Sequence, residues 1–313
     1  MNRIAIIGEC MVELNGKPFA EMHQTFGGDT LNAAVYTYRC LSDATQVSYV
    51  TALGTDPLSR GMKERWQAEG IDTSLVLNDP KHTIGAYLIQ LDELGERTFM
   101  YWRANSPASH IVQHPEFTNV IENISNNFDL VFLSGISLAI LSESDRNTML
   151  NVIQSFKQAG ITIAFDSNYR PALWGNEISK ILDSYTRMYN ATELALVTFD
   201  DEALIWGDNT PYETITRLVK QHGVKYVIVK LGERGCLIGG VEINEPIHVD
   251  TEEVKTVVDT TSAGDSFNGG FLSAFLSNKT LVECCQRGNA LAGIVIQHPG
   301  AIIPKEHTDQ LVK

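Results

Sequence analysis

Short apolar runs alternate with helix-length amphipathic segments along most of this chain, and that alternation limits the folds it can adopt. Helix-length stretches such as Asn147–Gln158 carry apolar residues near helical spacing. Continuous apolar strands that alternate with helices predict a mostly parallel sheet with helices on both faces, joined by right-handed crossovers. The runs that we expect to form the central strands are Ile4–Ile7, Val47–Thr51, Leu130–Ser134, Thr162–Asp166, Leu194–Val197 and Tyr226–Lys230.

Two early segments, Glu9–Gly27 and Ile84–Arg103, break the alternation and read better as antiparallel strands. The second holds Ala86–Leu91, a glycine-containing turn over Asp92–Glu96, and Arg97–Trp102, which together are a hairpin signal. A small strand assembly inserted in an α/β domain is a candidate lid that excludes water from a reaction. The alternative is an edge sheet with a structural role.

The length and composition of the chain fit one large domain. Its 313 residues, 43% of them hydrophobic, are ample for a sizeable core, so we expect one domain over residues 1–313 that includes the inserted strands. The net charge of −14, without a Lys/Arg run, argues against nucleic acid and anionic membranes as partners. Five cysteines without C-x-x-C spacing predict reduced thiols in a cytoplasmic protein.

A carboxylate stands directly after a loop of small residues in the C-terminal part of the chain. Ser262, Ala263 and Gly264 precede Asp265, and an apolar helical pattern then begins. Small residues and a helix N-terminus favour a bound anion, and a carboxylate beside that anion can accept a proton. Phosphoryl transfer to an alcohol needs this combination. A plain helix cap by Asp265 explains the four residues equally well.

The longer string Asp259–Phe267 resembles the C-terminal signature of the ribokinase-like, pfkB-type sugar kinases. That family usually has Gly-Ala-Gly-Asp, so Ser262 is a small departure from the pattern. The resemblance implies a ribokinase-like three-layer α/β/α fold with a mostly parallel central sheet and a small β-sheet lid. It also implies that Asp265 is the general base and that the backbone donors of Gly264 and Ala263 belong to the catalytic group.

Two N-terminal motifs extend the resemblance. Phe26–Ala34 is similar to the family's Gly-Gly-x-x-x-Asn-x-Ala element, and Thr51–Asp56 with Gly61 is similar to its Gly-x-Asp-x-x-Gly stretch. Each motif alone is a glycine-rich strand–helix junction and weak evidence. In the right order and at the right distances from Asp265, they make the resemblance cover nearly the whole chain.

A third segment, Val229–Cys236, resembles the family's Lys-x-Gly-x-x-Gly sequence, which leaves a strand, turns sharply and lies along ATP. An ordinary β-turn is the alternative. The chain has neither G-x-G-x-x-G nor G-x-x-x-x-G-K-[ST], which argues against a dinucleotide oxidoreductase and a P-loop enzyme. The resemblance implies ATP contacts from Asn168, Lys230, Gly232, Gly235, Ser262, Ala263, Gly264 and Asn289.

The family also has Asn-x-x-Glu after a central strand, where it helps to place magnesium. In this chain Phe199 stands in place of the Asn, whereas Glu202 fits the Glu. The resemblance therefore implies ATP and Mg²⁺ as cofactors, with Glu202 holding the metal through water. Mg²⁺ keeps several waters and uses few direct protein ligands, so the loss of one amide need not end activity.

Two arginines suggest an acidic substrate. Arg103 ends the expected hairpin and Arg170 follows a central strand, and arginine binds carboxylates and phosphates in bidentate fashion. The alternative is a solvated Arg103 and a structural Arg170. The segments around both arginines are similar to those of bacterial 2-keto-3-deoxygluconate kinases. That resemblance implies substrate contacts from Gly28, Asp29, Asn32, Tyr87, Tyr101, Arg103, Arg170 and Asp265.

The sequence thus predicts a phosphotransferase with an alcohol acceptor. We expect ATP-dependent phosphorylation of 2-keto-3-deoxy-D-gluconate at its C6 hydroxyl, with Asp265 as the base. The alternatives are a kinase for a neutral sugar, of the fructokinase or ribokinase type, and a non-catalytic sugar-binding regulator on the same scaffold. Exposed edge strands of the lid predict a homo-oligomer.

Overall fold

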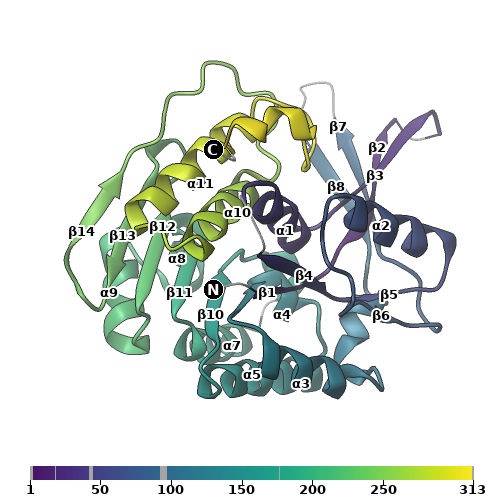
Figure 1. Ribbon diagram of the computed structural model, residues 1–313, viewed down its shortest axis with the longest axis horizontal. Coiled ribbons are helices and arrows are strands. Elements are labelled where there is room, and N and C mark those ends of the chain that lie inside the picture. The colour runs from purple at the N-terminus through teal and green to yellow at the C-terminus, as the bar shows by residue number, and fades with distance from the viewer. Residues whose placement is uncertain (1–2, 18, 42–44, 92–96, 176, 312–313) are drawn as a thin grey trace.

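The computed structural model describes residues 3–17, 19–41, 45–91, 97–175 and 177–311. The strands of the central sheet are β1 Arg3–Ile7, β4 Gln46–Val50, β9 Leu130–Ser134, β10 Thr162–Asp166, β11 Leu194–Thr198, β12 Tyr226–Lys230, β13 Cys236–Gly240 and β14 Ile243–Val249. They lie in the order β14-β13-β12-β11-β10-β9-β1-β4 (Figure 1). The strands from β12 to β4 are parallel, and β13 and β14 extend one edge in antiparallel pairing. The predicted, mostly parallel sheet is confirmed.

Helices cover both faces of this sheet because alternate strand residues point to opposite sides. Ile4 and Ile6 of β1 pack in one core, and Ala5 and Ile7 pack in the other. The helices that share the first core are α1 Asp29–Arg39, α2 Pro57–Ala68, α10 Ala263–Leu276 and α11 Leu281–Val295. Those that share the second are α3 Phe117–Asn127, α5 Glu143–Gln158, α7 Ile178–Ala191 and α9 Pro211–His222.

The shorter elements are mostly connections. They are the helices α4 Gly135–Ala139, α6 Pro171–Trp174 and α8 Phe199–Trp206, the 3₁₀ turns Pro107–Gln113, Gly232–Arg234, Lys305–His307 and Asp309–Leu311, and the strands β5 Ala52–Leu53 and β6 Leu77–Asn78. Helix α5 begins earlier than the predicted Asn147. Its start is fixed by Ser142, whose Oγ accepts a hydrogen bond from the Asp145 backbone N–H at 3.2 Å.

A second, four-stranded sheet in the order β3-β2-β7-β8 lies beside the central one (Figure 1). Its strands are β2 Met11–Gly16, β3 Met22–Gly27, β7 Ala86–Leu91 and β8 Arg97–Trp102. The pairs β2–β3 and β7–β8 are antiparallel, as predicted. However, β2 and β7 pair in parallel, so the prediction of purely antiparallel strands is wrong. The predicted turn over 92–96 lies outside the described residues.

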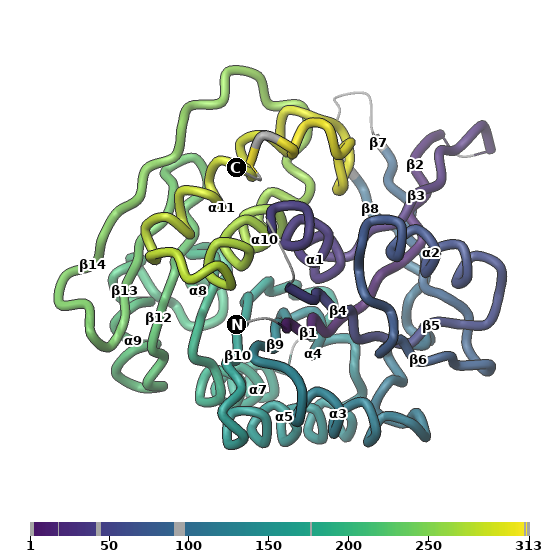
Figure 2. Tube along the Cα trace, viewed as in Figure 1, coloured from purple at the N-terminus to yellow at the C-terminus, as the bar shows by residue number. Residues whose placement is uncertain are grey.

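Two helices from opposite ends of the chain meet at the centre of the molecule. The traces of α1 and α10 lie side by side (Figure 2), and the two helices pack against each other. Their N-termini point to the carboxyl-end edge of the parallel strands, where α/β proteins usually bind ligands. Within the described ranges, no helix has the length and apolarity that a bilayer span requires.

Candidate active site

A cavity of about 650 Å³ opens where the parallel strands end, between the small sheet and the N-terminus of α10. Each of its walls comes from a different part of the chain. Of the residues predicted for substrate, ATP or catalysis, the ones that line it are Gly28, Asp29, Asn32, Tyr87, Tyr101, Arg103, Asn168, Arg170, Lys230, Ser262, Ala263, Gly264 and Asp265. The fold therefore brings the N-terminal and C-terminal motifs to one site.

Asp265 is the third residue of α10, and its carboxylate faces the start of α1. Asn32 Nδ2 donates a hydrogen bond to Asp265 Oδ2 at 2.9 Å. Burial, and then the nearby carboxylate of Asp29, raise the pKa of Asp265 to about 7. The helix cap position belongs to Ser262, so the reading of Asp265 as a plain cap is not what the structure has. A carboxylate with a pKa near neutrality suits proton transfer at physiological pH.

Ser262 holds the backbone at the turn into α10 in a left-handed conformation, with φ 65° and ψ 14°. This conformation costs a residue with a Cβ roughly 1–2 kcal/mol, and glycine adopts it freely. The glycine of the family pattern that the sequence resembles would adopt this conformation without strain. Ser262 Oγ is buried beside the Asp265 carboxylate, and its hydrogen bonding there lowers the pKa of Asp265, against the larger effect of burial.

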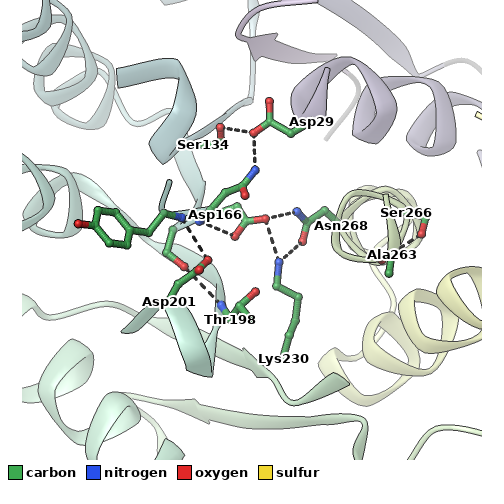
Figure 3. Close-up of polar contacts among 12 residues, drawn as sticks. Asp29, Ser134, Asp166, Thr198, Asp201, Lys230, Ala263, Ser266 and Asn268 are labelled. Carbon is green, nitrogen blue, oxygen red and sulfur yellow. Dashed lines mark hydrogen bonds and ion pairs between the residues drawn. The ribbon is translucent and has the colours of Figure 1, made fainter. Parts of the chain in front are cut away.

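Asp29 opens α1 and is held from two neighbouring strand ends (Figure 3). Ser134 Oγ donates to its carboxylate at 2.5 Å, and Asn168 Nδ2 donates at 2.6 Å. Burial raises the pKa of Asp29 above its ordinary value. The Asn168 side chain, predicted on the ATP side, therefore contacts a substrate-side residue.

Lys230, at the end of β12, points across the sheet edge to Asp166 at the end of β10 (Figure 3). Lys230 Nζ donates to Asp166 Oδ2 at 2.8 Å and to Asn268 Oδ1 at 3.2 Å. Asn268, on α10, donates to the same Asp166 oxygen at 2.6 Å. These three buried side chains join two strands to the helix that carries Asp265.

The two arginines of the cavity differ in what they contact. Arg103 donates to the buried carboxylate of Glu9, which also accepts from Ser106 Oγ. Arg170 is exposed, donates to its neighbour's carbonyl oxygen, and makes no ion pair within the described residues. The cavity therefore presents one neutralised guanidinium and one available one.

Four predicted residues lie away from the cavity wall. Glu202 is fully buried on the inner side of α8, where Tyr189 and Arg217 donate to its two oxygens. Glu202 therefore does not line the cavity, and burial raises its pKa to about 7 against the opposing effect of Arg217. Its role in holding magnesium through water stays a prediction. Gly232 and Gly235 form the expected turn, and Asn289 donates to the carbonyl oxygens of Val249 and Asp250 at 3.3 and 3.1 Å.

The residue before Glu202 does reach the cavity. Asp201 accepts a hydrogen bond from the Tyr169 backbone N–H at 3.2 Å, and burial together with Asp166 raises its pKa to about 6. Among the described residues, no cluster of three or more His, Cys, Asp or Glu side chains could hold a metal. Mg²⁺ needs no such cluster, since one or two carboxylates and the nucleotide phosphates suffice. Asp201 has the chemistry for this task.

Sequence reasoning did not select several functional neighbours. Asp166 and Asp201 follow buried strands at the ligand-binding edge, and that position was an available signal. Glu9 also follows the first strand directly. Asn268 gave no signal, because it lies within an apolar helix far from its partners in sequence.

The comparisons with known proteins agree with this geometry. The family model described as "pfkB family carbohydrate kinase" matches residues 1–308. A 2-dehydro-3-deoxygluconokinase of Haemophilus influenzae is 53% identical, over 97% of this chain and 96% of the relative. One from Escherichia coli K12 is 41% identical, over 97% of this chain and 98% of the relative.

Solved structures share the fold. A 2-dehydro-3-deoxygluconokinase of Thermotoga maritima superposes with a TM-score of 0.84 at 19% identity, covering 99% of this chain and 98% of that one. A putative ribokinase II of E. coli, solved with ATP and Mg²⁺, superposes with a TM-score of 0.84 at 22% identity, covering 100% and 99%. At these identities the likeness establishes the ribokinase-like fold.

Proposed function

The chain belongs to the pfkB family of carbohydrate kinases, and from this premise we propose that it phosphorylates 2-keto-3-deoxy-D-gluconate at the C6 hydroxyl. The products are 2-keto-3-deoxy-6-phosphogluconate and ADP. The observation that carries the proposal is 53% identity, over nearly the full length of both chains, to a kinase named for this sugar acid.

Asp265 is the proposed general base. As the C6 oxygen attacks the γ-phosphorus and the bond to ADP breaks, the hydroxyl proton passes to the Asp265 carboxylate. The backbone N–H groups of Gly264 and Asp265 at the start of α10 then stabilise the transferring phosphoryl group. The Ala263 N–H, which the family resemblance implies as a third donor, donates to the Thr260 carbonyl oxygen at 3.2 Å. With a pKa of about 7, Asp265 is basic enough to take the proton and is still largely ionised at slightly alkaline pH.

Magnesium accompanies ATP and neutralises charge on its phosphates. We propose that Asp201 holds it in this chain, through water, because Asp201 lines the cavity and makes no direct ion pair among the described residues. The nearby charges of Arg170 and Lys230 lower the pKa of Asp201, against the larger effect of burial. The Glu202–Arg217 ion pair joins α8 to α9. The remaining nucleotide contacts are proposed for Lys230, Gly232, Gly235 and Asn289, as the family resemblance implies.

Arg170 is proposed to bind the substrate carboxylate, since its guanidinium lines the cavity and makes no direct ion pair in the described part of the chain. Its acidic neighbour is Asp201, whose pKa it lowers. Arg103, already neutralised by Glu9, contributes its remaining donors. Gly28, Asp29, Asn32, Tyr87 and Tyr101 complete the proposed sugar site.

A coupled ADP-release assay with a panel of sugars tests the substrate. We expect turnover with 2-keto-3-deoxygluconate to exceed that with gluconate, fructose and ribose by at least about a hundredfold in kcat/KM. Arg170→Ala should raise KM for the acid far more than for a neutral sugar, and Arg60→Ala, an exposed control, should change neither. Higher efficiency with fructose or ribose would reject the acid, and no sugar-dependent turnover would favour a non-catalytic binder.

The small sheet is the proposed lid, because Tyr87, Phe99, Tyr101 and Arg103 reach the cavity from it. We further propose that lids of two copies pair, since the edge strand β8 exposes Trp102, along with Phe99 and Tyr101. Light scattering should give a homo-oligomer that Trp102→Lys dissociates. A wild-type monomer at micromolar concentration would reject this pairing.

All five cysteines are unpaired, which supports a reducing compartment such as the cytoplasm. Cell fractionation checks this location.

A further inference from the structure

The triangle of Lys230, Asp166 and Asn268 leaves one donor uncommitted at the cavity. An ammonium group carries three N–H donors. Two of those on Lys230 are used, one by Asp166 at 2.8 Å and one by Asn268 at 3.2 Å. The side chains of Lys230 and Asp166 are only 9% and 5% exposed, yet Lys230 lines the cavity. The third donor therefore has the cavity as its open direction.

The ammonium group lies beside the first turn of α10. A Cβ placed on Gly264 would stand 3.7 Å from Lys230 Nζ, which is an ordinary van der Waals distance. The ammonium group therefore lies close to the backbone of this turn. Gly264 immediately precedes Asp265, and its backbone N–H belongs to the unpaired donors of the helix N-terminus. A phosphoryl group next to Asp265 would meet the helix donors on one side and Lys230 on another.

Both partners of Lys230 are themselves fixed. Asp166 Oδ2 accepts from Lys230 and Asn268, and Asp166 Oδ1 accepts from the Asn168 backbone N–H at 3.3 Å. The two amide atoms of Asn268 are both used within the triangle. Because Asp166 and Asn268 are themselves hydrogen-bonded, they hold the flexible side chain of Lys230 in one position. Catalysis by charge stabilisation requires such a preorganised donor.

We propose that Lys230 is a catalytic residue that donates to the transferring γ-phosphoryl group, and that Asp166 and Asn268 are positioning residues that aim it. This rests on the kinase function proposed above. Lys230 stays protonated throughout, while the substrate hydroxyl gives its proton to Asp265. The stabilisation that Lys230 provides grows as negative charge spreads over the equatorial oxygens of the phosphoryl group in the transition state. A triangle with only a structural role would instead join β10, β12 and α10.

The test compares two variants that both lack the Asp166 charge. Lys230→Met alone would leave Asp166 buried without its cation, which is strongly destabilising. We therefore compare Asp166→Asn with the double variant Asp166→Asn/Lys230→Met, after circular dichroism and urea melts show both folded. We expect kcat to be lower in the double variant by about 10²- to 10³-fold, the usual effect of removing one such donor. Asp166→Asn/Lys230→Arg should recover part of this loss, because it restores a cation.

A second readout needs no sugar. The double variant should bind the non-hydrolysable ATP analogue AMP-PNP about fivefold or more weakly than Asp166→Asn does, while binding ADP equally well, because Lys230 contacts only the γ-phosphoryl group. Values of kcat within threefold of each other, with an unchanged AMP-PNP to ADP ratio, would overturn the proposal. If the wild type binds nucleotide normally but does not phosphorylate 2-keto-3-deoxygluconate, the proposed substrate is wrong and the binding comparison still decides the role of Lys230.

Discussion

Replacing Asp265 by Asn should abolish most activity and also make the protein more stable at alkaline pH. The two effects share one cause. The Asp265 carboxylate is buried and lies near two other carboxylates, those of Asp29 and Asp166, which disfavours its ionised form in the folded protein. An amide of nearly the same shape removes that charge and can still accept the hydrogen bond that Asn32 donates at 2.9 Å.

The size of the stability effect follows from the pKa of Asp265, which is raised from 3.8 to about 7. The folded protein therefore binds this proton more tightly than the unfolded chain does. The free energy of unfolding falls as pH rises from about 4 to about 7, by about 1.4 kcal/mol for each unit, and the loss is complete above pH 7. At pH 8 the free energy of unfolding of Asp265→Asn should thus exceed that of the wild type by at most about 4 kcal/mol. Below pH 4 this difference should vanish.

Urea unfolding at pH 5 and pH 8 measures the difference in free energy of unfolding between Asp265→Asn and the wild type. Steady-state kinetics with the preferred sugar measure the difference in kcat. Raised pKa values at Glu9 and Asp201 act on both proteins and largely cancel in the difference. Asp29 does not cancel, because removing the Asp265 charge also favours the ionised form of Asp29. Asp200→Asn, an exposed neighbour of the site, is the matched control and should change neither quantity. The loss of the base should lower kcat by about 10²- to 10⁴-fold, and wild-type kcat/KM should fall tenfold per unit below pH 7.

Two results would refute this reasoning separately. If Asp265→Asn is no more stable than the wild type at pH 8, burial and neighbouring charges do not penalise the Asp265 carboxylate. If the variant turns over within about threefold of the wild type, Asp265 is not the base.

Three further predictions concern other parts of the site. Arg217→Met should lower the free energy of unfolding by about 3–5 kcal/mol in urea melts, because it leaves the buried Glu202 and the largely buried Asp208 without the cation that they share; a loss under about 1 kcal/mol would contradict the buried ion pairs. Asp201→Asn should weaken the Mg²⁺ dependence of ATP binding in calorimetry, whereas Asp200→Asn should not; equal behaviour of the two variants would remove Asp201 from the magnesium site. Ser262→Gly should change the free energy of unfolding by less than about 1 kcal/mol in urea melts, because it relieves the left-handed backbone but removes the Ser262 hydroxyl from the Asp265 carboxylate; a loss above about 2 kcal/mol would show that the backbone at Ser262 is not strained.

The sequence predicted the fold class well because apolarity and helical spacing are local properties. The six predicted central strands were located to within a residue at their ends, whereas β13 and β14 were not predicted. Helix α5 was misplaced only at its start, where the Ser142 cap extends it. The parallel pairing of β2 with β7 could not be read in this way. That pairing joins segments about 74 residues apart, as Glu13 opposite Tyr87 shows, and strand partners at such separations leave no local pattern.

The cavity residues were predicted where a sequence motif determines the position of the backbone. They were not predicted where the contact depends on the orientation of a side chain. The residues of the small-residue loop and of the paired glycines all line the cavity. Glu202 occupies its expected place in the chain, but its side chain turns inward to Arg217, which lies 15 residues farther along. Asn268 and Asp166, 102 residues apart, meet only after folding. Rotamer choice and long-range contacts of this kind depend on packing.

The contact between α1 and α10 sets the order in which this protein can mature. Asn32 and Asp265 are 233 positions apart, so the base and the residue that holds it leave the ribosome at opposite ends of synthesis. Until the last fifty or so residues emerge, the buried face of α1, with Leu31 and Val35, has no helix to cover it. Contacts between residues so far apart in sequence form slowly, and nascent chains that lack them are prone to aggregation. A chain that ends before α10 therefore lacks both Asp265 and the helix that covers α1.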